Sequence, residues 1–403
     1  MITKLRPLAI YVHIPFCVRK CNYCDFLSGP ADRKSKEEYV RALFKEIESY
    51  RELAKEYQVQ TIFLGGGTPS SIDADFIVQI MNRLEDVFGF HAKDNPSMEI
   101  TIEINPGTVT KEKLQMYYDA GINRISFGLQ SACDEELLLL GRIHTFEQFV
   151  DNYQMARIVG FKNINIDLMS ALPGQTLESY QHTLEKVMAL DPEHISAYSL
   201  IIEEGTPFYE LYGEESTRKP EKELPSEEQE RLMYEKTKEW MHQHGYERYE
   251  ISNYARPGYE CIHNCTYWRR GDYLGIGSGA ASLIQDQRFS NERDLKRYIE
   301  LANQDERISA YHDELHVEKE QLSLQDKMEE FMYLGLRMMK GVSMKEFKAY
   351  FGKSFEEVYG SVANKLIEED LLKVQDGWIS LTDHGIDISN YVMSEFLLDN
   401  ELI

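Results

Sequence analysis

The chain lacks any apolar run long enough to cross a lipid bilayer. Residues 1–6 also lack the apolar stretch of a secretory signal peptide. These two absences predict a cytoplasmic protein without a transmembrane segment, and they leave only transient membrane contact open. With 403 residues, 42% of them hydrophobic, the chain can bury one large core and a smaller second core.

Basic side chains are scarce relative to acidic ones. The sequence has 44 lysines and arginines against 68 aspartates and glutamates, which gives a formal net charge of -24. Such a surface repels phosphate backbones, and no block of lysine or arginine offsets the repulsion. We therefore expect no nucleic-acid partner.

Cysteine is also scarce, but it is unevenly distributed. Three of the six cysteines, Cys17, Cys21 and Cys24, fall within one short segment. Thiols this close along the chain are too constrained to form a useful disulfide framework. In a reducing cytosol, clustered thiols are typical of metal binding or redox chemistry.

Short β-branched runs alternate with longer helical patterns between residues 8 and 200, which predicts parallel βαβ units. Residues 36–57 are one expected helix, because apolar residues recur along one of its faces. The expected strands are 9–14, 61–64, 98–104, 123–129, 163–169 and 194–200. We predict an α/β fold in which six strands form a partial, TIM-like (β/α)6 barrel.

The remainder of the chain divides into two further regions. We place the barrel at 1–212, a connecting region packed against it at 213–310, and a C-terminal helical domain at 311–403. The last region has three helical patterns followed by a hairpin signal at Asp376-Gly377, which resembles a winged helix. DNA binding is disfavoured, because acidic residues at 368–370 replace the basic stripe that it needs.

The clustered cysteines follow the first predicted strand in a CxxxCxxC pattern. In a parallel barrel, such a loop lies at the functional mouth. Three thiolates can bind three irons of a 4Fe-4S cubane and leave the fourth iron open to a ligand. The alternative is a zinc ion with His13 as the fourth ligand, because structural zinc needs four protein ligands.

A GGGTP run at residues 65–69 follows the second predicted strand. Glycines let the backbone approach a ligand closely, but the run lacks the lysine of a P-loop and the spacing of a dinucleotide fingerprint. Four polar residues end later strands or begin the following loops: Glu103, Gln130, Arg142 and Asp167. Burying such groups is costly, so each predicts a structural ion pair or a ligand contact.

The cysteine loop and the glycine run together resemble the radical S-adenosylmethionine superfamily. The resemblance implies a 4Fe-4S cluster on Cys17, Cys21 and Cys24, an open iron that binds S-adenosylmethionine, and an electron donor for the cluster. The glycine run resembles the motif that meets the amino group of S-adenosylmethionine, and the resemblance to the oxygen-independent coproporphyrinogen oxidase branch implies the full set of contacts: Tyr11, Tyr23, Gly66, Gly67, Thr68, Glu103, Gln130, Arg142, Asp167 and Ile201. In this set Arg142 would pair with a carboxylate.

Further motifs, such as YVHIPFC at 11–17 and SFGLQ at 126–130, resemble the oxygen-independent coproporphyrinogen oxidase branch of the superfamily. Two features depart from the oxidase. Phe26 stands where the oxidase has a fourth cysteine, and only sixteen residues precede Cys17. These departures instead resemble the haem-chaperone family of the branch, whose His-Asn-x-x-Tyr-Trp signature occurs here at 263–268.

The signature implies a haem site. An imidazole can ligate haem iron, and neighbouring aromatic side chains can cover a porphyrin face. His263 is the first candidate ligand, and its structural alternative is a histidine hydrogen-bonded within a loop. Cys261, Cys265 and His144 are further candidates.

Three functions stay open from the sequence. The resemblance favours a haem chaperone that holds a 4Fe-4S cluster, S-adenosylmethionine and haem, and that passes haem to an apo-haemoprotein acceptor. The alternative is an oxygen-independent coproporphyrinogen III dehydrogenase, which decarboxylates propionates oxidatively. Radical modification of RNA fits the cysteine loop but conflicts with the acidic surface.

Overall fold

The computed structural model describes residues 5–304 and 314–398. Within these ranges the chain forms a sheet of twelve strands, in the order β12-β11-β10-β9-β1-β2-β3-β4-β5-β6-β8-β7. The six central strands, β1 to β6, are all parallel to their neighbours in the series. They are β1 Arg6–Ile14, β2 Tyr57–Gly66, β3 Glu99–Ile104, β4 Arg124–Gln130, β5 Asn163–Ser170 and β6 His194–Ser199. Each overlaps a predicted strand, and the predicted partial barrel is confirmed.

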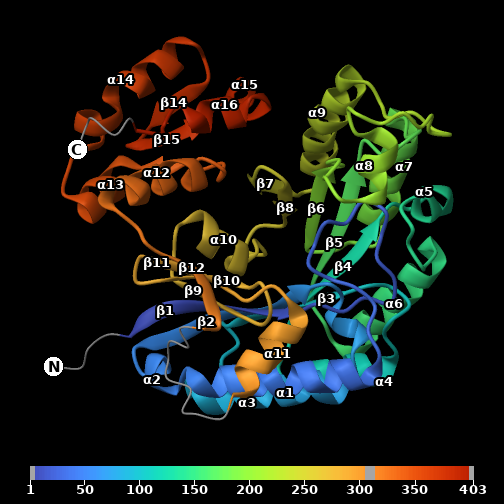
Figure 1. Cartoon of the computed structure of the whole chain (residues 1–403). Helices are drawn as coiled ribbons and strands as arrows, with labels where there is room; N and C mark the ends of the chain where they lie inside the picture. Colours follow the sequence, from blue (N-terminus) through green and yellow to red (C-terminus); the bar gives the residue numbers. More distant parts are fainter. Residues whose placement is uncertain (1–4, 305–313, 399–403) are drawn as a thin grey trace.

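Helices cover the outer, convex side of these strands (Figure 1). They include α1 Arg33–Ser49, α3 Ala74–Phe88, α4 Lys111–Asp119, α6 Phe146–Val159 and α7 Leu177–Met188. The predicted helix at 36–57 is wrong at its C-terminal end. After α1 the chain forms the short α2 Arg51–Ala54, and Tyr57 already belongs to β2, where it pairs with Arg6 of β1. The pairing with a distant strand outweighs the local helical pattern.

Successive residues of the barrel strands face two environments, as the period of a strand requires. In β3, for example, Ile100, Ile102 and Ile104 belong to the hydrophobic core, whereas Glu103 borders a cavity that opens to solvent. We call this cavity, of about 500 Å³, the lumen. Its polar wall from β3 to β6 consists of Glu103, Arg124, Ser126, Gln130, Asn165, Asp167, Ser196 and Ser199.

The region after β6 extends the sheet at both edges. Helix α9 Glu227–Gln243 leads into β7 Glu247–Glu250 and β8 Asn253–Ala255, and β8 pairs antiparallel with β6. The chain then crosses to the other edge, where β9 Tyr273–Ile276 pairs in parallel with β1. Strands β10 Ala281–Ile284, β11 Gln287–Asn291 and β12 His316–Gln321 complete this edge.

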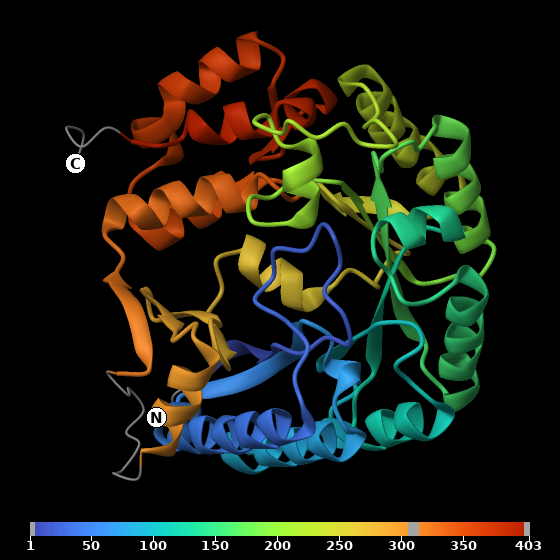
Figure 2. The same cartoon turned by 45° about the vertical axis from the view of Figure 1, so that its right-hand side comes forward.

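Helix α10 Ile262–Trp268 lies on the crossing between the two edges. It occupies the centre of the view in Figure 2, on the concave side of the strands. Residues His263, Asn264 and Tyr267 of α10 line the lumen. Three residues of the His-Asn-x-x-Tyr-Trp signature therefore form part of one wall of the lumen.

The C-terminal module has a core of its own, formed by residues from Met328 to Phe396. Its elements are α12 Leu324–Gly335, β13 Val342–Ser343, α13 Met344–Phe351, α14 Phe355–Glu368, β14 Leu372–Gln375, β15 Trp378–Leu381, α15 Asp383–Asp387 and α16 Ser389–Ser394. The predicted helices and hairpin are confirmed. None of the helices among residues 5–304 and 314–398 is long and apolar enough to cross a membrane.

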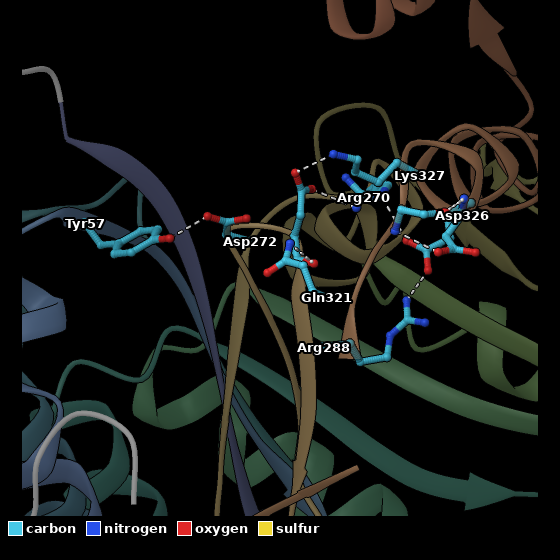
Figure 3. Close-up of polar contacts among 10 residues, drawn as sticks. Tyr57, Arg270, Asp272, Arg288, Gln321, Asp326 and Lys327 are labelled. Carbon is cyan, nitrogen blue, oxygen red and sulfur yellow. Dashed lines mark hydrogen bonds and ion pairs between the residues drawn. The ribbon is translucent and has the colours of Figure 1, made fainter. Parts of the chain in front are cut away.

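Ion pairs attach this module to the edge of the sheet, and the carboxylate of Glu330 among them is buried. The carboxylate of Glu330, on α12, accepts hydrogen bonds from Arg270 (2.8 Å) and from Arg288 of β11. Lys327, also on α12, forms an ion pair with Asp286 at 3.1 Å. Figure 3 shows Arg270, Arg288 and Lys327 converging from the two parts of the chain.

Candidate functional site

The cysteine loop follows β1 and turns over the mouth of the barrel. Two backbone hydrogen bonds hold the loop in place. Cys17 N donates to Gly29 O (3.0 Å) and joins the two ends of the loop, and Thr68 N donates to Phe16 O (2.8 Å) and joins the loop to the glycine run. All six cysteines are free thiols. Cys17, Cys21 and Cys24 line one pocket together with the glycine run, which we call the cysteine pocket.

Two side chains donate hydrogen bonds to sulfur in the cysteine pocket. Thr68 Oγ1 lies 3.5 Å from Cys17 Sγ, and Arg142 Nη1 lies 3.5 Å from Cys21 Sγ. Such donors stabilise sulfur that carries negative charge, as it does in a thiolate bound to iron. The loop therefore brings three thiols to one pocket, two of them with supporting donors, which fits a 4Fe-4S cluster.

A single zinc ion fits less well. Both ring nitrogens of His13 are already engaged: Nε2 is 2.9 Å from Leu27 O, and Nδ1 is 3.0 Å from the Tyr11 hydroxyl. Among the described residues, no three His, Cys, Asp or Glu side chains are arranged to hold one metal ion. A cubane offers a separate iron to each thiolate, so its ligands need not converge on one point.

The glycine run brings the backbone against the cysteine loop. Gly66 has a φ of 110°, and a Cβ at this position would collide with the imidazole of His13. A Cβ on Gly67 would lie 2.8 Å from Phe16 O. Only glycine combines this backbone angle with so close an approach, so the run lets the loop and β2 meet at the pocket.

Glu103 is the penultimate residue of β3 and lies beside the glycine run. Its carboxylate accepts a hydrogen bond from Gly66 N at 3.0 Å. Burial, followed by repulsion from Asp167, raises the pKa of Glu103 to about 8. A cationic group such as an ammonium would restore the ionised form, so the position suits the amino group of a ligand.

Asp167 of β5 faces the same space. Burial raises the pKa of its carboxyl group, against hydrogen bonds that favour the ionised form. These bonds come from Asn165 Nδ2 (2.7 Å) and Ser126 Oγ (3.3 Å). The two acids thus lie in one low-dielectric pocket, where ligand hydroxyl or amino groups can offset their repulsion.

Gln130 and Arg142 also line the cysteine pocket, next to the two acids. Gln130 ends β4 at a register shift, and its φ of 75° is unusual for a non-glycine residue. Such backbone irregularities change the direction of a side chain and are common next to functional sites. The Arg142 guanidinium donates to Gly128 O and to Asn105 Oδ1, while its buried Nε has no partner among the described residues.

The structure brings the predicted site residues to two adjoining cavities. The cysteine pocket is lined by Cys17, Cys21, Tyr23, Cys24, Gly66, Gly67, Thr68, Glu103, Gln130, Arg142 and Asp167. The lumen is lined by Tyr11, Tyr23, Glu103, Gln130, Asp167, Ile201 and His263. The two share Tyr23, Phe26, Glu103, Ser126, Gln130 and Asp167, so a ligand at the cysteines would lie at the entrance to the lumen.

His263 is fully buried on α10. Its Nδ1 is 2.8 Å from Thr61 Oγ1, and its Nε2 is 2.8 Å from the Tyr267 hydroxyl. Burial, followed by the charge of Arg124, lowers the pKa of His263 to about 3. The imidazole is therefore neutral, as a metal ligand must be, but both of its nitrogens have hydrogen-bond partners.

The other candidate haem ligands are also buried. Burial raises the pKa of the Cys261 thiol, and it raises that of Cys265 to about 12. Burial and the nearby Arg142 lower the pKa of His144 to about 3. Neither ring nitrogen of His144 has a partner among the described residues.

Two charged residues, one that holds α10 and one that lines the lumen, were not predicted from the sequence. Glu99 accepts hydrogen bonds from the backbone N–H groups of Ile262 and His263, both at 2.9 Å, and so holds the first turn of α10. Arg124, on β4, was not identified either. The signal was the alternation of polar and apolar residues in the predicted strands, which indicates a polar barrel interior.

The fold and the site define a radical S-adenosylmethionine protein. The model of the Radical SAM superfamily matches residues 11–187, and that of the HemN C-terminal domain matches residues 322–388. The chain belongs to the HemW family. It is 37% identical to the heme chaperone HemW of Bacillus subtilis, over 96% of this chain and 98% of that protein.

A second relative supports this assignment, and a solved structure supports the fold. Identity to the heme chaperone HemW of Escherichia coli is 34%, over 98% of this chain and 100% of the relative. The solved structure of coproporphyrinogen III oxidase (HemN) from Escherichia coli superposes with a TM-score of 0.83 at 26% identity. That match covers 98% of this chain and 90% of the oxidase chain.

Proposed function

We propose that the protein is a haem chaperone that holds a 4Fe-4S cluster and S-adenosylmethionine at the cysteine pocket and haem at the lumen. The observation that carries the proposal is the junction of the two cavities, which share both acids and Gln130. Haem would pass from this site to an apo-haemoprotein in the cytoplasm. Full-length relatives that bear the name heme chaperone support the same function.

At the cysteine pocket, Cys17, Cys21 and Cys24 would hold the cluster, which supplies an open iron and one-electron chemistry once an external donor has reduced it. Arg142 would orient the carboxylate of S-adenosylmethionine. Glu103 would accept hydrogen bonds from the amino group, while Gln130 and Asp167 bind the rest of the molecule. Gly66, Gly67 and Thr68 supply close backbone approach and a donor to sulfur.

In the lumen, aromatic side chains offer surface to a planar ligand. Tyr11, Phe63, Tyr198 and Tyr267 line the cavity together with His263. A cavity of about 500 Å³ falls in the usual range for small-molecule sites. We propose His263 as the iron ligand, and this role requires its Nε2 to exchange the Tyr267 hydroxyl for the metal.

Oxidative decarboxylation of coproporphyrinogen is the alternative, and the similarity to the HemN structure favours it. Phe26 argues against it. This side chain lies at the border of both cavities and is 62% exposed. It has no ionisable or redox-active group, so it cannot replace the fourth cysteine that the resemblance places there in the oxidase.

A turnover assay separates the two functions. Cluster-loaded protein is given a reductant, S-adenosylmethionine and coproporphyrinogen III, and products are followed by chromatography under anaerobic conditions. The same preparation is titrated with haem. We expect stoichiometric haem binding and no repeated turnover, whereas multiple-turnover formation of protoporphyrinogen would contradict the chaperone assignment.

A further inference from the structure

Arg124 is a buried cation that the site described above does not use. It is the first residue of β4, is only 2% exposed, and lines the lumen. Its guanidinium forms no hydrogen bond and no ion pair with any residue in the described ranges, and its Nε is sealed from solvent. An unpaired buried charge is costly, so a partner is expected.

Burial opposes the charge of Arg124, and the groups that favour it include the Cys261 thiol and the carboxylates of Glu99 and Asp167, which raise its pKa. The oxygens of Glu99 are engaged by the backbone of α10. Those of Asp167 accept hydrogen bonds from Asn165 and Ser126, and Asp167 also borders the cysteine pocket. Neither acid is within ion-pair distance of the guanidinium, so their charges favour the cation from a distance but leave its N–H groups without a direct partner in the described protein.

Other largely buried arginines of this chain are matched. Arg270 pairs with Glu330 and Asp286, and Arg248 donates to the Tyr234 hydroxyl. Arg142 donates to two oxygens at the cysteine pocket. The difference indicates that the partner of Arg124 is a group that enters the lumen.

We infer that Arg124 is the anion-binding residue of the lumen and that it binds a propionate carboxylate of haem. The inference rests on the proposed function and adds the chemistry by which this cavity would recognise its ligand. Guanidinium binds carboxylates through two parallel hydrogen bonds, which fixes orientation as well as charge. Haem carries two such carboxylates, and the polar neighbours Ser196 and Asn165 would complete a wet, polar end of the cavity.

The methionyl carboxylate of S-adenosylmethionine has the same chemistry, so the test separates the two sources. Dissociation constants are measured by absorbance titration for haem and for its dimethyl ester, and by calorimetry for S-adenosylmethionine. The proteins are the wild-type chain, Arg124→Gln and the matched control Arg124→Lys, which keeps the positive charge. Circular dichroism and iron content verify that each variant is folded and cluster-loaded.

For the wild-type chain we expect the ester to bind about ten-fold or more weakly than haem, the scale of one charge-assisted hydrogen bond. Arg124→Gln should lose a similar factor for haem and should no longer distinguish haem from the ester. Arg124→Lys should keep part of the preference. Binding of S-adenosylmethionine should stay within about two-fold in all three proteins.

Several results would overturn the inference. One is that folded Arg124→Gln still prefers haem over its dimethyl ester by the same factor as the wild type. Another is that the substitution weakens binding of S-adenosylmethionine ten-fold and leaves haem binding unchanged. If Arg124→Gln does not fold, equal binding of haem and ester by the wild-type chain is sufficient to reject it. Failure of the wild-type chain to bind haem at all would instead reject the proposed function.

Discussion

Glu103 brings a carboxyl group into a pocket where its charge is disfavoured. Its raised pKa, about 8, means that the ligand-free folded protein holds a proton that the unfolded chain, with a pKa near 4.3, has released. Since the folded state binds more protons over this interval, the free energy of unfolding contributed by this group falls as pH rises from about 5 to 8.

Replacing Glu103 by Gln should remove this pH dependence. Denaturant unfolding of ligand-free protein at pH 6 and pH 8.5 should show that Glu103→Gln gains stability relative to the wild type at the higher pH. The exposed Glu228 gives a control, because Glu228→Gln leaves the lumen unchanged. Parallel stability profiles for Glu103→Gln and the wild type would contradict the account of this acid.

The three thiols at the mouth should be required together. Replacing Cys17, Cys21 and Cys24 by Ala should abolish cluster uptake, because each would bind a different iron. Iron, sulfide and the electron paramagnetic resonance signal of the reduced cluster are measured after anaerobic reconstitution. Cys133→Ala is the matched control, since this thiol lies outside both cavities, and wild-type iron and sulfide in the triple variant would refute the assignment.

His263 offers a test of the haem ligand. If His263 ligates the haem iron, His263→Ala should shift the Soret band and lower haem retention. Tyr267→Phe should preserve the wild-type band, because it removes the hydroxyl that occupies Nε2 and leaves the imidazole in place. Absorption spectra of the haem-loaded variants give the answer. If His263→Ala has an unchanged spectrum, the ligand is to be sought among Cys261, Cys265 and His144.

Among the elements, the end of β2 can approach the cysteine loop closely because residue 66 is a glycine. Gly66→Ala should lower the free energy of unfolding by about 1–3 kcal/mol and impair cluster uptake, because a Cβ at a φ of 110° is strained and meets His13. Gly29, in the same neighbourhood, has open space around its Cα. Gly29→Ala should therefore be nearly neutral in chemical denaturation, and equal effects of the two substitutions would contradict this explanation.

The elements that local patterns specify could be predicted from the sequence. The six barrel strands and the C-terminal hairpin overlap the expected ranges, because periodicity and turn residues are local signals. The end of the helix at 36–57 could not be predicted, since Tyr57 is recruited by pairing with β1. The parallel insertion of β9 beside β1 likewise depends on contacts far apart in the chain.

The residues of the cysteine pocket could be predicted from the sequence, whereas two charged residues at and near the lumen could not. Cys17, Cys21 and Cys24 stand in one short motif, and the glycine run and the strand-end acids follow recognisable strands. Arg124 and Glu99 carry no such motif. Their importance follows from contacts between distant segments: Arg124 lines the lumen, and Glu99 binds the backbone of α10, which only the arrangement of β3, β4 and α10 creates.

For the whole molecule, the arrangement is a barrel whose mouth carries the cysteine loop and whose interior is walled by α10. The C-terminal module is fixed to the barrel edge through Glu330 and its arginines, away from the cysteine loop. Exposed apolar side chains at the mouth, Phe26 and Ile201 among them, border the lumen. Haem held there would be accessible to an acceptor without movement of the module.

The most direct test of the chaperone assignment is haem transfer. Haem-loaded, cluster-replete protein is mixed with an apo-cytochrome, and absorption spectra and gel filtration follow the haem, with free haem at equal concentration as the reference. The account predicts that haem moves to the acceptor and that the chain is recovered free of haem. Retention of haem by the chain when a competent acceptor is in excess would contradict it.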